Sequence, residues 1–289
     1  MINEWEMIKK LGYPGEDRLS ESLYLGGENI VERIIGPNRI LPLDLEEVIE
    51  AGINSLSNQI IELKSAQQIE AEIKDALYQK KGYSLIRMGD GELITLAHDI
   101  ILDTNDIKSV KRMDFLAYAG VNLPDYQIRD LLTNNILEAD VVGIPVIRWP
   151  TFQQLFIKLV KQHKWNIKRM SLTESVINYD LHIKTSLFHD LLTNNKVLLI
   201  GNRMKEGGEL LKSLGYENIV GSIPVKNIYD VPAVLEEAKK YDYTVALVSA
   251  GIPANVICVE LAKRNKVAID FGHLIDELIN KKKVIHPKE

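Results

Sequence analysis

The sequence predicts an α/β fold, in which a Rossmann-like, mostly parallel sheet has flanking helices and follows an N-terminal helical extension. Short, almost wholly apolar runs recur along the chain, as expected of strands that are buried on both faces. Helical patterns separate these runs, which indicates βαβ units. The runs are Tyr83–Arg87, Asp140–Ile144, Val197–Ile200, Ile219–Ile223, Thr244–Val248 and Lys266–Ile269, and the clearest helical patterns are Glu209–Leu214, Pro232–Lys240 and Asn255–Arg264.

The main domain is predicted to span residues 65–289, with a helical extension over residues 1–64. Ser65 and Gln68 match a capping box, which begins a helix that Gly82 ends. Glycines and prolines punctuate residues 1–43, where we expect irregular chain with one short helix.

A stripe of apolar residues follows Asp44, whose residue type suits a helix N-cap. The members of the stripe are Leu45, Ile49, Ile53, Leu56, Ile60 and Leu63. This spacing is close to a heptad seam, although Gly52 interrupts it. Two interpretations stay open, namely a helix packed on its own domain and the interface of a homodimer.

The composition excludes several classes of protein. The chain of 289 residues is 46% hydrophobic and 26% charged, which is typical of a globular protein. A formal net charge of −5 provides no basic field for nucleic acid. The N-terminus lacks the basic and apolar segments of a secretory signal, and no apolar run approaches the ~20 residues of a membrane span. We therefore expect a cytoplasmic protein without a membrane span.

The first informative loop is Arg87-Met88-Gly89-Asp90-Gly91-Glu92, which follows a predicted strand. Ligands of parallel α/β sheets bind outside the carboxyl ends of the strands. Gly89 and Gly91 allow a sharp turn, so the carboxylates of Asp90 and Glu92 can converge on one divalent cation. Such a cation clamps a diphosphate and neutralises its charge as it leaves. Arg87 is placed to pair with phosphate or to orient a carboxylate.

Two further loops have the small residues that suit a nucleotide. Gly201, Asn202 and Arg203 follow one strand, where backbone amides and the arginine can hold a pyrophosphate. Ser249, Ala250 and Gly251 follow another strand and precede a helix, whose N-terminus favours an anion. Neither loop has a Walker or a G-x-G-x-x-G sequence.

The last predicted strand ends at Asp270, with His273 beyond it. These two residues can complete a metal site or orient a phosphate or a sugar hydroxyl. The base that would deprotonate an acceptor stays unassigned among Asp180, His182 and Asp270. Trp149, in the segment Arg148–Phe152, is either a ring for stacking on a base or sugar or a hydrophobic anchor.

Three segments together resemble one bacterial family, the GT-D fold glycosyltransferases, first catalogued as a domain of unknown function. The resemblance rests on Ser84–Glu92, Ser249–Asn255 and Ala268–His273, and it covers about residues 65–280. It implies transfer of a sugar from a UDP-sugar, with Mn²⁺ or Mg²⁺ near Asp90 and Glu92 and the nucleotide near Gly251. Family members build glycans on bacterial surface proteins or polymers, so the implied acceptor is a glycan or a glycoprotein.

The residues and the resemblance together predict the catalytic groups Asp90, Glu92, Arg87 and His273 and the metal ligands Asp90, Glu92 and His273. The predicted nucleotide-binding residues are Gly89, Gly91, Gly201, Asn202, Arg203, Ser249, Ala250, Gly251 and Asp270. Two alternatives to a glycosyltransferase stay open, namely a nucleotide-binding regulatory module without turnover and a metal-dependent phosphohydrolase.

Overall fold

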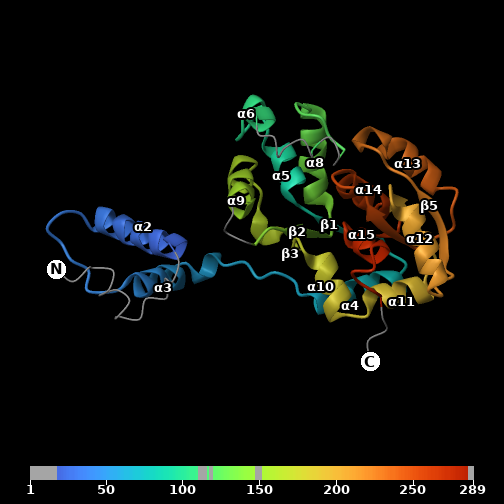
Figure 1. Ribbon diagram of the computed structural model, residues 1–289, viewed down its shortest axis with the longest axis horizontal. Helices are drawn as coiled ribbons and strands as arrows, with labels where there is room; N and C mark the ends of the chain where they lie inside the picture. Colours follow the sequence, from blue (N-terminus) through green and yellow to red (C-terminus); the bar gives the residue numbers. More distant parts are fainter. Residues whose placement is uncertain (1–17, 110–115, 117–119, 147–151, 286–289) are drawn as a thin grey trace. The chain divides into compact units, whose positions relative to one another are not determined.

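The computed structural model describes residues 18–109, 116, 120–146 and 152–285 (Figure 1). The chain divides into two compact units, residues 1–61 and residues 62–289. The larger unit contains the sheet, and the smaller unit is helical in its described part.

Seven strands form one sheet in the described part of the chain, in the order β3-β2-β1-β7-β6-β4-β5. Every neighbouring pair is parallel. The strands are β1 Tyr83–Arg87, β2 Val141–Ile144, β3 Leu172–Glu174, β4 Val197–Gly201, β5 Ile219–Ile223, β6 Val245–Ser249 and β7 Val267–Asp270. The first three strands form one half of the sheet and the last four form the other. The halves meet where β1 pairs with β7, with Leu85 opposite Ile269.

Helices cover both faces of this sheet (Figure 1). On one face, α14 packs on β1, β6 and β7 and also contacts α8 and α13. The flanking helices on or near this side are α5 Asp90–Ala97, α6 Thr104–Ser109, α8 Tyr126–Glu138, α9 Phe152–Gln162, α13 Val231–Ala238 and α14 Pro253–Ala262. On the opposite face lie α4 Ala66–Tyr78, α10 Ile177–Lys184, α11 Leu187–Asn194, α12 Met204–Ser213 and α15 Leu274–Ile279.

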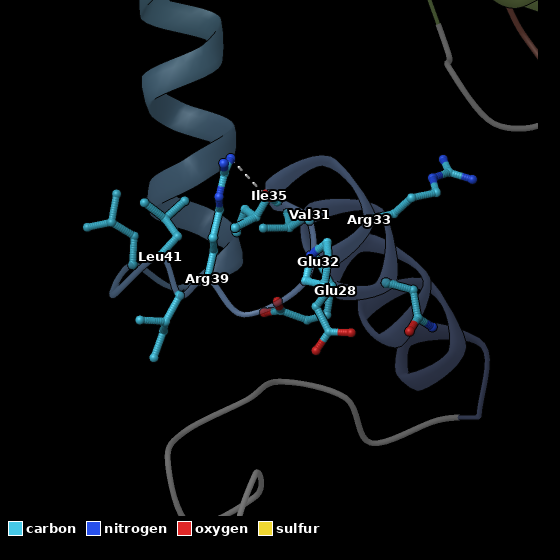
Figure 2. Close-up of a pocket in the computed structure, with 12 residues that line it drawn as sticks. Glu28, Val31, Glu32, Arg33, Ile35, Arg39 and Leu41 are labelled. Carbon is cyan, nitrogen blue, oxygen red and sulfur yellow. Dashed lines mark hydrogen bonds between the residues drawn. The ribbon is translucent and has the colours of Figure 1, made fainter.

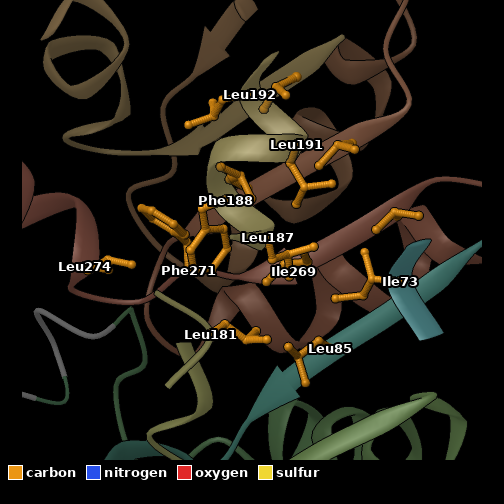
Figure 3. Close-up of a cluster of buried hydrophobic side chains, with 14 of the residues drawn as sticks. Ile73, Leu85, Leu181, Leu187, Phe188, Leu191, Leu192, Ile269, Phe271 and Leu274 are labelled. Carbon is orange, nitrogen blue, oxygen red and sulfur yellow. The ribbon is translucent and has the colours of Figure 1, made fainter. Parts of the chain in front are cut away.

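The main hydrophobic cluster lies between this second set of helices and the sheet (Figure 3). Phe188 of α11 meets Phe271, just beyond β7, edge to face, with ring centroids 4.8 Å apart. Leu85 and Ile269, from the two strands at the centre of the sheet, belong to the same cluster. The burial of such aliphatic and aromatic side chains is the main driving force for folding. The core therefore fixes the ends of β1 and β7 firmly.

The predicted α/β class and the mostly parallel sheet are confirmed, but one strand was missed. β3 has only three residues, Leu172, Thr173 and Glu174, and lacks an apolar run. The helix expected from the capping box is α4, in which Ser65 and Gln68 cap each other's backbone.

Helix α12 begins at Met204, earlier than the predicted pattern Glu209–Leu214, so Gly207 and Gly208 lie inside it. A Cβ atom on Gly207 would come within 2.2 Å of Ile275 Cδ1, so the glycine lets α12 approach α15.

The smaller unit contains α2 Arg18–Ile35, α3 Leu45–Ser55 and the 3₁₀ turn Ser57–Gln59 in its described part. The expectation of irregular chain with one short helix was wrong here, because α2 has 18 residues and runs through its two glycines. Gly27 instead serves close packing, since a Cβ atom there would lie 2.6 Å from Leu45 Cδ2. Asp44 caps α3 in a capping box with Glu47, as its residue type predicts.

The smaller unit covers little of its own apolar stripe. Helix α3 has no buried residue, and it ends before the stripe does. The exposed aliphatic residues of the unit are Leu25, Ile30, Ile34, Ile40, Leu41, Leu43, Ile49, Ile53, Leu56 and Ile60. A pocket of about 640 Å³ lies beside α2. Glu28, Glu32, Arg39 and Leu41 are among the residues that line it (Figure 2). A pair of helices without its own core gains stability when another apolar surface covers it.

No helix among the described residues combines the length and the apolar character that crossing a membrane requires.

The exposed stripe predicts that a second copy of the chain covers it. Light scattering should give a dimer for the wild type and a monomer for Ile53→Glu combined with Ile60→Glu, because two charges would be buried unpaired. The control is Asn54→Glu with Gln59→Glu, which adds the same charge at exposed polar positions. A monomeric wild type, or a dimer that survives both pairs of changes, would contradict the prediction.

Candidate active site

A cleft of about 340 Å³ lies at the carboxyl ends of the strands, around the point where the two halves of the sheet meet. Such a topological switch point is the usual ligand site of open α/β sheets. Segments that follow β1, β3, β4, β5, β6 and β7 line this switch-point cleft. The rest of the site is built on the side chains at the ends of β1 and β7.

An ion pair joins the last residues of these two strands. Nη2 of Arg87 donates to Oδ1 of Asp270 at 3.1 Å, and the side chain of Asp270 is 6% exposed. Burial disfavours the charge on Arg87, but Asp270 and Glu92 outweigh this effect and raise the pKa of the guanidinium. Arg87 is therefore a permanent cation that fixes β1 to β7 at the floor of the cleft.

The same guanidinium also organises the segment after β3. Nη1 of Arg87 donates to the carbonyl oxygen of Ser175 and to Oδ1 of Asn178, both at 3.1 Å. Nδ2 of Asn178 in turn donates to the carbonyl oxygen of Phe271 at 2.9 Å. One arginine thus ties the ends of β1, β3 and β7 together.

Gly272 is required directly beside this arginine. Its φ is +55°, which favours glycine, and a Cβ atom there would lie 2.0 Å from Nη2 of Arg87. Its backbone N–H donates to Oδ1 of Asp270 at 3.0 Å, and its carbonyl accepts from Oγ of Ser249 at 2.7 Å. Gly201 has a comparable role, because its φ is +145° and a Cβ atom would lie 2.0 Å from the carbonyl oxygen of Ser249.

The acidic pair lies in the first turn of α5, which begins at Asp90 after an N-cap at Gly89. Oε2 of Glu92 accepts from the backbone N–H of Gly89 at 2.9 Å, and Oδ1 of Asp90 accepts from that of Gly91 at 2.9 Å. Negative charge in this position is favoured by the helix dipole. Asp90 is exposed to the cleft, whereas Glu92 is half-buried, so the two carboxylates are not equivalent.

Glu92 has a strongly shifted pKa. Burial raises the pKa of its carboxyl from 4.5 to about 7, and the negative charge of Asp270 adds to the rise. Hydrogen bonds from backbone N–H groups and the nearby Arg87 act in the opposite direction but do not cancel it. Near neutral pH, Glu92 can therefore hold or release a proton.

The opposite side of the cleft carries groups that suit an anion. The backbone N–H groups of Gly251 and Ile252 donate to no acceptor within the described residues, and both residues line the cleft just before α14. Unpaired amides before a helix form a natural phosphate site. Lys226, after β5, adds an exposed cation to the same cleft.

Arg203 and His273 meet at the rim through one carboxylate. Nη1 of Arg203 lies 2.9 Å from Oδ1 of Asp276, and Nδ1 of His273 lies 3.1 Å from Oδ2 of the same residue. Arg203 also pairs with Glu206. The side chain of His273 is 78% exposed, so it stands at the mouth of the cleft rather than on its floor.

The structure brings the four predicted loops around one cleft. The predicted residues that line it are Arg87, Gly89, Asp90, Gly91, Glu92, Asn202, Arg203, Ser249, Ala250, Gly251, Asp270 and His273. Gly201 lies just behind them, buried at the end of β4. Of the three candidate bases, only Asp270 lines the cleft, while Asp180 pairs with Lys184 at 2.9 Å.

The three predicted metal ligands do not form a ready-made metal site. Among the described residues, no group of three or more His, Cys, Asp or Glu side chains is arranged to hold a metal ion. Asp90, Glu92 and His273 therefore do not form such a group by themselves. Trp149 lies outside the described residues.

Several other residues of the site were given no role from the sequence. Ser175 and Asn178 follow the short strand β3, and their signal was lost with that strand. Lys226 follows β5, and Asp276 lies in α15. Applying the rule of strand ends to every predicted strand, β5 included, would have found Lys226.

The chain belongs to the GT-D fold-like domain family, whose sequence profile matches residues 64–278. This confirms the resemblance seen in the three motif segments.

Solved structures show the same fold. A glycosyltransferase (DUF1792) from Streptococcus sanguinis is 20% identical, with a TM-score of 0.50 over 80% of this chain and 88% of that chain. The domain of unknown function 1792, described as having a distinct glycosyltransferase fold, is 16% identical, with a TM-score of 0.51 over 83% of this chain and 87% of that chain. No curated protein matches the chain.

The raised pKa of Glu92 predicts a pH-dependent stability. Between about pH 4.5 and pH 7 the folded chain holds a proton on Glu92 that the unfolded chain has lost, so stability falls as the pH rises through this window. Glu92→Gln keeps an acceptor for Gly89 but cannot ionise. We therefore compare the free energy of unfolding of Glu92→Gln with that of the wild type. This difference should favour the variant more at about pH 8 than at about pH 5, by on the order of 1–3 kcal/mol. Urea unfolding at both pH values measures this, and an unchanged difference would contradict it.

Proposed function

We propose that this protein is a glycosyltransferase that moves a sugar from a nucleoside diphosphate sugar, first of all a UDP-sugar, to a glycan or glycoprotein acceptor. One observation carries the proposal, namely that the switch-point cleft has an anion-binding side and a carboxylate side. Gly251, Ile252 and Lys226 provide the first, and Asp90 and Glu92 provide the second. The family and the fold support the same reaction class.

The cleft suits the leaving diphosphate. The unpaired amides and the lysine would bind its oxygens, and the amides, as part of the backbone, are held in place before the reaction begins. As the acceptor oxygen bonds to the anomeric carbon, its hydroxyl proton passes to a base or to water, the bond from that carbon to the diphosphate breaks, and the electron pair of that bond leaves with the diphosphate. Preorganised donors stabilise this growing charge better than water does, because they need no reorientation.

The donor set also fits a divalent cation that arrives with the diphosphate. Mg²⁺ in such sites takes one or two protein carboxylates and completes its shell with phosphate oxygens and water. Asp90, exposed to the cleft, would be the main protein ligand, and Glu92 would be the second once it has lost its proton. When bound, the cation would neutralise charge on the diphosphate.

Arg87 and Asp270 have a positioning role in this proposal. Both are committed to each other and to neighbouring loops, so they hold Asp90 and Gly272 at the cleft rather than meeting the donor themselves. His273, exposed and paired with Asp276, would contact the donor or the acceptor at the mouth. The proposed acceptors are the surface glycans or glycoproteins that the family resemblance implies, modified in the cytoplasm before export.

The test is a screen of UDP-, GDP-, dTDP- and CDP-sugars for release of the nucleoside diphosphate, with Mn²⁺, with Mg²⁺ and with EDTA. With the donor that reacts, Asp90→Asn should lower turnover by about 10²–10³-fold, because it removes one electrostatic contact from the leaving group. The control is Asp242→Asn, which makes the same change at an exposed carboxylate that does not line the cleft, and it should change turnover little because an exposed ion pair contributes little.

Thermal melts of both variants must match the wild type, since Asp90 is exposed and opens no cavity when changed. Turnover of Asp90→Asn above about a tenth of the wild type, against that expected loss, would contradict the assignment of the site. Nucleotide binding without any sugar transfer or hydrolysis would favour the regulatory module, and release of inorganic phosphate would favour the phosphohydrolase.

A further inference from the structure

A second cavity adjoins the switch-point cleft on the side of β2 and β3. It measures about 270 Å³ and shares Gly89, Asp90, Ser175 and Val176 with the cleft. The remaining residues that line it are Met88, Pro145, Val146, Phe152 and Glu174. Its walls are therefore mainly apolar, and the first turn of α5 separates it from the cleft.

Along the carboxyl ends of the strands, the groups change in order from cations and amides to a carboxylate and then to apolar side chains. Lys226 and Arg203 lie beyond β5 and β4, and the unpaired amides of Gly251 and Ile252 lie beyond β6. Asp90 follows β1, in the middle, and the apolar cavity lies beyond β2 and β3. A diphosphate bound to Lys226 and these amides would thus have one end toward Asp90 and the second cavity, and in the proposed reaction this is the sugar end, because the acceptor must reach the anomeric carbon.

We infer that the second cavity is the acceptor subsite and takes an uncharged sugar ring. The inference rests on the proposed glycosyltransferase function and adds where the other substrate binds. In a transferase the acceptor hydroxyl must reach the anomeric carbon, so the two substrates need adjoining sites with a common wall. The segments around Asp90 and Ser175 are that wall, because they line both cavities.

The residues of the cavity match the two sides of a sugar ring. A sugar has an apolar face, which packs on an aromatic or aliphatic surface such as Phe152 and Val146, and hydroxyl groups around its edge, which need acceptors. Asp90 and Glu174 supply carboxylates. The carboxylate of Glu174 has no hydrogen bond or ion pair within the described residues, and it is half-buried at the end of β3. Two carboxylates at one small cavity would repel an anionic acceptor.

The test uses a substitution that fills this cavity without touching the cleft. Val146 lines only the second cavity, so Val146→Phe should block the acceptor and leave donor binding intact. The matched control is Val284→Phe, which makes the same change at an exposed position. Each protein is assayed for hydrolysis of the reacting nucleotide sugar, for affinity for UDP by calorimetry, and for transfer to a panel of 4-nitrophenyl glucoside, galactoside and N-acetylglucosaminide.

We expect Val146→Phe to lower transfer to the glycoside at least tenfold while donor hydrolysis and UDP affinity stay within about twofold of the wild type, because the donor cleft is unchanged. The wild type should bind the neutral glycosides more tightly than 4-nitrophenyl glucuronide, as measured by saturation-transfer NMR.

Three results would overturn the inference. Normal transfer by Val146→Phe would mean that the acceptor binds elsewhere, and weaker UDP binding would mean that the cavity holds the nucleoside. Preferred binding of the glucuronide would exclude an uncharged ring. A wild type that neither hydrolyses nor transfers any donor is a separate outcome, because it removes the proposed function itself and the acceptor subsite with it.

Discussion

The arrangement of the whole site depends on the buried ion pair between Arg87 and Asp270. The pair closes the seam between the two halves of the sheet, where β1 meets β7. A buried charge is tolerated when its other hydrogen-bonding groups are satisfied as well. Ser175 and Asn178 accept from Nη1 of Arg87, and Gly272 donates to Asp270, so the pair is embedded in a network that spans three strand ends, while Nε of Arg87 is buried without a partner among the described residues.

Because of this pairing, the structural role and the anion-binding role belong to different residues of the cleft. Because Arg87 is held by Asp270 and the loop after β3, the anion-binding role falls to the unpaired amides at Gly251 and Ile252 and to Lys226. The negative charge of Asp270 also reaches Glu92 and helps to raise the pKa of its carboxyl to about 7. Burial is the larger cause of this raised pKa, and Arg87 opposes it, so the ion pair adjusts the protonation of Glu92 but does not set it.

The sequence predicts the fold well where strands are long and apolar. Val197–Ile200 and Thr244–Val248 were recognisable because burial on both faces requires unbroken aliphatic runs. The strand Leu172–Glu174 was not, because it is short and Leu172 is its one aliphatic residue. The role of Gly207 and Gly208 could not be predicted for another reason, since these glycines set the distance between α12 and its neighbours, which local sequence does not encode.

The same limit applies to the site. The loops around Asp90, Gly251 and Asp270 could be predicted, because strand ends of a parallel sheet converge. The structural role of Arg87 could not be predicted, because it depends on contacts between residues far apart in the chain. Arg87 contacts Ser175 and Asp270 in this way. The protonation of Glu92 follows from burial, which only the packed structure reveals.

A double-mutant cycle on the ion pair tests the central claim most directly. Urea unfolding would compare the wild type with Arg87→Met, Asp270→Asn and the double variant. The account predicts that each single change costs about 3–5 kcal/mol, because it strands a buried charge or its hydrogen-bonding partner, and that the double variant loses less than the sum by at least ~1 kcal/mol. Strictly additive losses, or single variants as stable as the wild type, would show that the pair does not hold the two halves of the site together.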